Sequence, residues 1–151
     1  MSHSIHNIYL HLIFGTKERD PCLGPVIRKR LHSYLAEISS NLGYKTILFN
    51  GWFDHVHGLV LMGKDVLPRD WIRDLKANSS RFLKRECGLP GGFAWQGGYA
   101  LFSVSPGGVD ACRQYIHNQV EHHRTKTYQE ELEEFLGRYK VDVDREYLWT
   151  D

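Results

Sequence analysis

Two extended segments separated by only two residues lie between two helical segments, and this order restricts the fold more than any other feature of the chain. Residues 45–52 and 55–62 have the composition of strands. Apolar residues at helical spacing precede them over 25–42 and follow them over 68–86. Pro25 and Pro68 suit the first turn of each helix. The pattern indicates a sheet backed by two helices.

The outer strands complete the pattern. Residues 8–14 alternate, with Leu10 and Leu12 on one side and His11 and Ile13 on the other, and residues 99–104 form a fourth short strand. The order βαββαβ predicts an α+β, ferredoxin-like sandwich, whose antiparallel sheet carries helices on one face.

Two more helices are expected after the fourth strand. The first opens at Ser105-Pro106 and the second at Thr127, where Thr127 and Glu130 form a capping box. Their apolar stripes are Val109, Cys112, Ile116 and Val120 in the first, and Tyr128, Leu132, Phe135, Leu136 and Tyr139 in the second.

Charge is unevenly distributed along the 151 residues, for which we expect a single domain, 1–151. Residues 129–151 hold 8 of the 18 acidic and 3 of the 19 basic side chains, which leaves 16 basic and 10 acidic in residues 1–128. A basic body with an acidic C-terminal helix and tail from about 127 permits a phosphate-backbone partner without requiring one.

Other composition features exclude several classes of protein. No apolar run approaches the length of a membrane span, and the N-terminus lacks the pattern of a signal peptide, so we expect a cytoplasmic protein. Cys22, Cys87 and Cys112 are far apart, which favours free thiols over a zinc ribbon or a disulfide framework.

His55 and His57 are the first candidates for chemistry. Residues i and i+2 of a strand share a face, so both imidazoles project side by side and can bind one metal ion. Asp54 is a candidate to hold a ring N–H of the pair. An isolated His-x-His has many false positives, and two partly exposed strand histidines are the competing interpretation.

Tyr115 and Gln119 are the second pair, one turn apart on a predicted helix and off its apolar stripe. The amide oxygen of Gln119, together with the imidazoles of His55 and His57, forms a mixed nitrogen and oxygen site suited to Mg²⁺ or Mn²⁺. A nearby cation lowers the pKa of a phenol, which is a weak nucleophile near neutrality, and makes covalent attack on phosphate feasible. The resulting ester conserves the energy of the broken bond.

The motifs together resemble the single-tyrosine HUH transposases of minimal insertion sequences and their REP-associated relatives. Asp54-His55-Val56-His57 resembles the HUH motif (histidine, hydrophobic, histidine), and Tyr115-Ile116-His117-Asn118-Gln119 resembles the tyrosine helix. Further matching segments, in the same order along the chain, are 11–17, 75–81, 95–99 and 102–105. Gly15 and Glu18 depart from the family pattern.

The resemblance implies a transposase that cleaves and rejoins single-stranded DNA through a 5′-phosphotyrosine. Tyr115 would be the nucleophile, and His55, His57 and Gln119 would hold Mg²⁺ or Mn²⁺. The family recognises hairpins at the element ends. It is typically a homodimer with the tyrosine helix contributed in trans, although REP-associated relatives can be monomers.

Basic residues near these motifs are candidates to contact DNA. They are Lys17, Arg73, Lys76, Arg81, His122, His123 and Arg124. A solvated helix face explains the basic residues of 68–86 about as well.

Two other functions remain open on the sequence alone. A metal-dependent phosphodiesterase that uses water would share the histidines without needing Tyr115, and a non-catalytic nucleic-acid-binding module would need neither. Replacing Tyr115 by phenylalanine separates the three functions.

Overall fold

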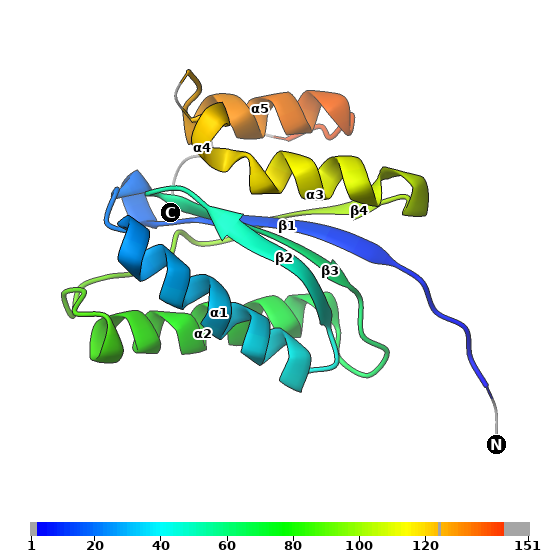
Figure 1. The fold of residues 1–151 in the computed structure, drawn as a ribbon, viewed down its shortest axis with the longest axis horizontal. Coiled ribbons are helices and arrows are strands. Elements are labelled where there is room, and N and C mark those ends of the chain that lie inside the picture. Colours follow the sequence, from blue (N-terminus) through cyan, green and yellow to red (C-terminus); the bar gives the residue numbers. More distant parts are fainter. Residues whose placement is uncertain (1–2, 124, 144–151) are drawn as a thin grey trace.

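A computed structural model describes residues 3–123 and 125–143 of the chain (Figure 1). The described elements are β1 (Tyr9–Gly15), a 3₁₀ turn η1 (Lys17–Arg19), α1 (Pro25–Asn41), β2 (Lys45–Gly51), β3 (His55–Leu61), α2 (Pro68–Glu86), β4 (Ala100–Val104), a 3₁₀ turn η2 (Pro106–Gly108), α3 (Val109–His117), α4 (Gln119–His122) and α5 (Tyr128–Arg138).

The four strands form one antiparallel sheet in the order β2-β3-β1-β4. Consecutive elements β1-α1-β2 and β3-α2-β4 each place a helix across the same face, as the ferredoxin-like pattern predicts. The predicted α+β fold is therefore confirmed.

Helices cover both faces of the sheet (Figure 1). Helices α1 and α2 lie across one face, and α3, α4 and α5 lie across the other. The alternation in β1 decides which side chains meet each layer: Leu10, Leu12 and Phe14 belong to the main apolar core with α1 and α2, whereas Ile13 packs with α5. The sequence placed these side chains on opposite sides correctly.

The predicted tyrosine helix is not continuous. It consists of α3 and α4, which meet at Asn118, and Asn50 of β2 donates from its amide to the carbonyl oxygens of Ile116 (2.9 Å) and His117 (3.2 Å) at the end of α3. Val120, expected in the apolar stripe, is 49% exposed, so that part of the prediction is wrong. The break turns α4 and places Gln119, rather than Val120, in the buried layer.

Two further sequence expectations have direct counterparts. Thr127 and Glu130 form the predicted capping box at the start of α5, with both reciprocal hydrogen bonds present. Among the described residues, no helix combines the length and hydropathy that crossing a membrane requires.

Candidate metal and tyrosine centre

His55 and His57 lie side by side on β3 and are fully buried beneath α3, α4 and α5. The Nδ1–H of His55 donates to Asp54 Oδ1 at 2.8 Å, as expected for a carboxylate that orients a metal-binding imidazole. This contact leaves His55 Nε2 directed into the protein. Asp54 therefore fixes which nitrogen of His55 faces the centre.

His57 has a different neighbour behind it. Its Nδ1 lies 2.8 Å from Nε2 of His11 on β1, and the two rings stack with centroids 5.1 Å apart. His11 is itself fully buried, and burial is the main reason that its pKa falls well below the ordinary value. The neutral His11 ring thus supports His57 without adding a positive charge.

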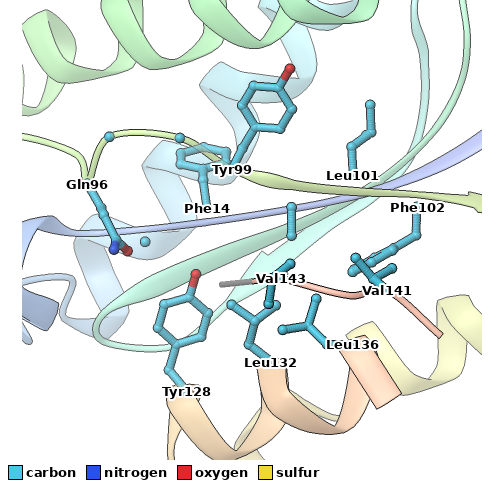
Figure 2. Close-up of a pocket in the computed structure, with 14 residues that line it drawn as sticks. Phe14, Gln96, Tyr99, Leu101, Phe102, Tyr128, Leu132, Leu136, Val141 and Val143 are labelled. Carbon is cyan, nitrogen blue, oxygen red and sulfur yellow. The ribbon is translucent and has the colours of Figure 1, made fainter. Parts of the chain in front are cut away.

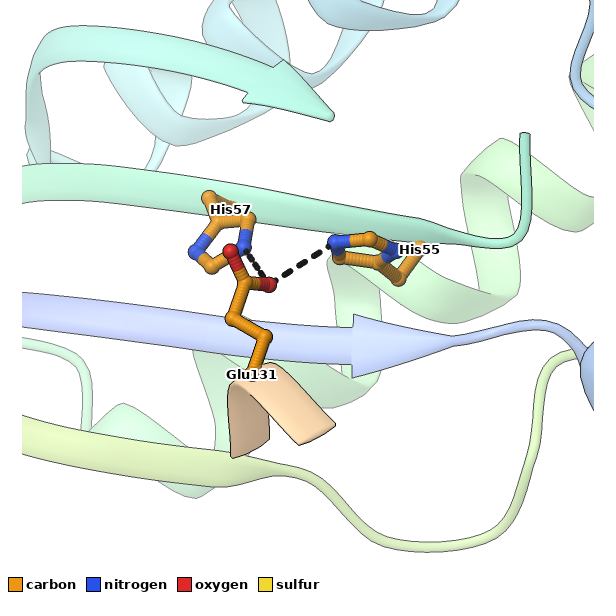
Figure 3. A group of neighbouring side chains, drawn as sticks. All are labelled: His55, His57 and Glu131. Carbon is orange, nitrogen blue, oxygen red and sulfur yellow. Dashed lines mark hydrogen bonds and ion pairs between the residues drawn. The ribbon is translucent and has the colours of Figure 1, made fainter. Parts of the chain in front are cut away.

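A carboxylate that the sequence interpretation overlooked occupies the middle of the group. Glu131 of α5 is fully buried, and its Oε1 lies 2.8 Å from His57 Nε2 and 3.0 Å from His55 Nε2 (Figure 3). The two histidines come from β3 and the carboxylate from α5, and His57 and Glu131 are 74 positions apart in the sequence. Their ligand atoms all lie within 4.8 Å of one another, close enough for one metal ion.

The other carboxylate oxygen faces the tyrosine pair. The hydroxyl of Tyr115 donates to Glu131 Oε2, and the amide of Gln119 donates to the same oxygen at 3.2 Å. Gln119 Oε1 in turn lies 3.2 Å from His55 Nε2. The structure therefore brings the four residues expected from the sequence to one point, with Glu131 between them.

His123 belongs to this cluster as well. Its side chain is 1% exposed, and Nε2 lies 3.1 Å from Gln119 Oε1 and 3.4 Å from Glu131 Oε2. The sequence placed His123 on a DNA-contacting surface, whereas here its ring is inside the centre. His122 stacks on the Tyr115 ring, with centroids 4.1 Å apart.

The electrostatics of the centre keep the carboxylate ionised. Burial alone raises the pKa of Glu131, but the electrostatic interaction with His57 and the hydrogen bonds from His123, His55 and His57 outweigh burial and hold that pKa well below its usual range. For His55, burial is likewise outweighed by the contacts with Asp54 and Glu131, so its pKa is raised. Burial dominates for His57 and lowers its pKa.

The tyrosine is held in its protonated form in this state. Burial raises the pKa of Tyr115, and the neighbouring Glu131 charge and hydrogen bond raise it further. A phenol in such surroundings is a poor nucleophile until positive charge enters the centre. The donor set fits a divalent ion, because it joins two imidazole nitrogens with carboxylate and amide oxygens.

Gly15, one departure from the family pattern, has a structural reason. A Cβ built at Gly15 would lie 2.6 Å from Cε2 of Tyr128, the first residue of α5. The Tyr128 ring stacks on His55 with centroids 4.3 Å apart. The absence of a side chain at position 15 therefore lets α5 approach the histidines.

A cavity of about 350 Å³ opens beside the centre, between α5 and β4 (Figure 2). Its lining is mainly apolar, and Tyr128 and Gln96 supply polar groups. A second cavity of about 520 Å³ lies along α2 and shares Gly98 and Tyr99 with the first. The two cavities therefore meet at the β4 edge of the sheet.

Two of the candidate DNA-contacting residues, Arg73 and Lys76, line the second cavity. Arg73 is exposed and pairs with Asp70 and Asp74, and Arg81 is exposed and donates to Asn78. Lys17 is exposed in η1. Arg124 lies outside the described residues.

Lys76 has a role that the sequence did not reveal. Its amine donates to the carbonyl oxygens of Gln96 (2.7 Å) and Gly98 (2.8 Å), so it fastens the loop before β4 to α2.

Comparison with known proteins gives this arrangement a context. Residues 4–119 match the family model described as "Transposase IS200 like", which is more than half of the chain. The chain belongs to the IS200-like transposase family. The candidate metal-binding side chains and Tyr115 thus converge in a chain of this family.

Solved structures agree on the fold. The chain is similar to a candidate transposase from Deinococcus radiodurans R1, with 26% identity, a TM-score of 0.63, and coverage of 79% of this chain and 95% of that one. It also resembles a REP-associated tyrosine transposase bound to a REP hairpin, with 13% identity, a TM-score of 0.56, and coverage of 82% and 72%. No curated protein sequence matches this transposase.

Glu131 lies beyond the residues that match the family model, so resemblance could not reveal it. A periodicity signal was nevertheless present. Glu131 falls three residues after Tyr128 and four before Phe135, which is on the apolar stripe of the predicted helix. A carboxylate at a core position requires a partner, and this rule would have marked it.

Proposed function

We propose that this transposase cleaves and rejoins single-stranded DNA through a covalent 5′-phosphotyrosine at Tyr115, with Mg²⁺ or Mn²⁺ as the cofactor. The convergence of Tyr115, Gln119, His55 and His57 around one buried point carries the proposal. Neither a water-using phosphodiesterase nor a binding module needs a tyrosine hydroxyl in that position.

The proposed cleavage step exchanges one ester for another. The Tyr115 oxygen forms a bond to the scissile phosphorus, and the bond from phosphorus to the 3′-oxygen breaks. The leaving oxygen keeps the electron pair of that bond, and the proton lost by the Tyr115 hydroxyl is balanced by the one gained by the 3′-oxygen. Attack by a 3′-hydroxyl on the phosphotyrosine reverses the exchange and rejoins the strand without an external energy source.

His55, His57 and Gln119 are the proposed ligands of the divalent ion. When bound, such an ion polarises a phosphoryl oxygen and lowers the pKa of a nearby phenol. Asp54 and His11 keep the two imidazoles in place. The half-buried Tyr115 ring is held between His122 on one side and Phe135 on another.

DNA is proposed to reach the centre around the β4 edge. Arg73 and Lys76 line the cavity along α2. Lys17, Arg81, His122 and Arg124 remain further candidate contacts, whereas the ring of His123 is inside the centre and would have to move to contact DNA. The similar REP-associated transposase is described as bound to a REP hairpin, which supports a hairpin as the partner here. We propose that the paired part lies against α2 and that the single strand continues past Tyr99 toward Tyr115.

The predicted homodimer with the tyrosine helix in trans stays a prediction. In the described chain Tyr115 reaches its own chain's Glu131, and its ring centroid is 6.1 Å from that of His57. A partner is therefore not needed to bring these groups together. Mixing a Tyr115→Phe chain with a His57→Ala chain tests trans action, because only exchange of tyrosine helices restores cleavage.

A covalent-adduct assay tests the proposed function. Wild type, Tyr115→Phe and the control Tyr9→Phe are incubated with labelled hairpin DNA carrying single-stranded flanks from the element ends, with Mn²⁺ or EDTA, and separated on a denaturing gel. A shifted protein–DNA band is expected for wild type and Tyr9→Phe with Mn²⁺ only. Tyr115→Phe should reduce it at least about 1,000-fold, because no other group replaces the nucleophile.

The same gel distinguishes the two alternatives. Cleavage without a shifted band that survives Tyr115→Phe would identify a phosphodiesterase that uses water. Retarded DNA on a native gel with no cleavage of a verified site would identify a binding module.

A further inference from the structure

The proposed ligand set of His55, His57 and Gln119 carries no negative charge. Hard divalent cations such as Mg²⁺ and Mn²⁺ favour carboxylate oxygens, and a buried double positive charge without an anion nearby is unfavourable. Asp54 accepts a hydrogen bond from His55 Nδ1, on the opposite side of the ring from Nε2. Its carboxylate therefore cannot also bind an ion at His55 Nε2. The carboxylate of Glu131 is the acidic group that the described structure places against both imidazoles.

The distances between candidate ligand atoms match those around a small octahedral ion. Ligands at about 2.1 Å from such an ion and at right angles lie about 3.0 Å apart. Glu131 Oε1 lies 3.0 Å from His55 Nε2 and 2.8 Å from His57 Nε2, and Gln119 Oε1 lies 3.2 Å from His55 Nε2. The side chains are thus already at the separations of neighbouring ligands.

The two oxygens of the carboxylate face different groups. Oε1 faces the imidazoles, whereas Oε2 accepts the hydroxyl of Tyr115. We propose, on the basis of the function proposed above, that Glu131 is the anionic ligand of the divalent ion through Oε1, and that Oε2 positions the Tyr115 hydroxyl beside that ion. One side chain then sets the distance between cofactor and nucleophile.

The surroundings of Glu131 support a positioned ligand. Phe135 and Tyr128, one turn to either side on α5, are buried, with Tyr128 stacked on His55 and Phe135 edge-on to Tyr115. Gly15 provides the space that this approach requires. Helix α5 would therefore be part of the metal site, although it lies outside the residues that match the family model.

Mn²⁺ binding to the full chain tests this role independently of DNA cleavage. Free Mn²⁺ is measured by electron paramagnetic resonance during titration of wild type, Glu131→Gln and Glu134→Gln, with circular dichroism to verify folding. Glu134 is an exposed acid on the same helix that pairs with Lys126, so it controls for overall charge. We expect Glu131→Gln to weaken Mn²⁺ binding at least about tenfold and Glu134→Gln to leave it within about twofold.

A second readout covers the case in which Glu131→Gln is poorly folded. Mn²⁺ should raise the Tm of wild type, and Glu131→Asp, which keeps the charge on a shorter side chain, should retain part of that increase. Equal Mn²⁺ affinity in wild type and Glu131→Gln would overturn the proposal, as would faster adduct formation by Glu131→Gln, because the carboxylate would then obstruct the site. Either result leaves the tyrosine mechanism intact, provided that wild type still forms the adduct and Tyr115→Phe does not.

Discussion

The two faces of the four-stranded sheet differ in the side chains that they bury. Against α1 and α2 the strands present aliphatic and aromatic side chains, among them Leu12, Phe14 and Val60, in one large apolar core. Against α3, α4 and α5 they present His11, His55 and His57, which are just as buried. Since buried polar groups contribute less to stability than well-packed apolar ones, the first face should hold the fold together and the second should hold the chemistry.

The largest stability effect is expected on the apolar face. Trp71 of α2 is fully buried, stacks on Tyr44 and donates from its indole N–H to Ser39 Oγ at 2.9 Å. Trp71→Ala should lower the free energy of unfolding by about 3–5 kcal/mol, because it leaves a cavity and an unpaired hydroxyl. Urea denaturation measures the effect, and a loss below about 1 kcal/mol would show that this face is not the main source of stability.

On the polar face, replacing both partners of a buried interaction by apolar residues should not lower the free energy of unfolding, in contrast to Trp71→Ala on the apolar face. His57→Leu alone should cost about 3 kcal/mol, because it removes an imidazole that lies 2.8 Å from the buried Glu131 charge. The double variant His57→Leu, Glu131→Leu should recover that loss and reach or exceed wild-type stability by about 1–3 kcal/mol.

The double variant should also form no DNA adduct. A double-mutant cycle on unfolding free energies checks the coupling, and additive losses would mean that the two side chains act on stability independently of each other, which contradicts this prediction.

The pH dependence of stability provides a smaller test on the α1 side. Burial, helped by the positive charge of Arg28, lowers the pKa of His32 to about 4. Because the folded pKa lies below the unfolded value of 6.5, this histidine favours folding fully above pH 6.5, and the contribution is lost as the pH falls toward 4. The loss should be about 2–3 kcal/mol.

His32→Gln should remove that part of the pH profile. NMR titration of the ring protons measures the pKa directly, and a midpoint above 6 would contradict the assignment.

The smallest expected effect concerns the contact between β1 and α5. Gly15→Ala should cost about 1–2 kcal/mol and reduce Mn²⁺ affinity, because its Cβ displaces the Tyr128 ring and α5 with it. Gly92→Ala is the matched control, since a Cβ there meets nothing within 4 Å. If both variants behave like wild type, α5 is not held against the sheet by this contact.

The sequence predicted the elements well where periodicity and composition agreed. The alternation of β1, the proline starts of α1 and α2 and the capping box of α5 are local signals, and the structure contains each of them. The histidine pair was also visible, because it depends only on spacing within one strand. The Tyr115 and Gln119 pair was visible from its spacing of four residues, although the structure divides that segment between α3 and α4.

What the sequence could not supply was contact between distant elements. His11 meets His57 across 46 positions, and Glu131 meets His57 across 74, and neither spacing has a local signature. The break at Asn118 was missed because the apolar stripe of the tyrosine helix continues through it, whereas the amide of Asn50 from β2 satisfies the carbonyl oxygens at the end of α3. Tertiary contacts, not propensity, decide these features.

The amine of Lys76 links α2, on one face of the sheet, to the loop that precedes β4. It is attached to α2 and holds the carbonyl oxygens of Gln96 and Gly98, and these two residues also line the cavity next to Tyr128. A ligand that attracts this amine competes directly with the loop for its three protons. A ligand that binds this amine on the α2 side should therefore release the loop that lines the cavity next to α5.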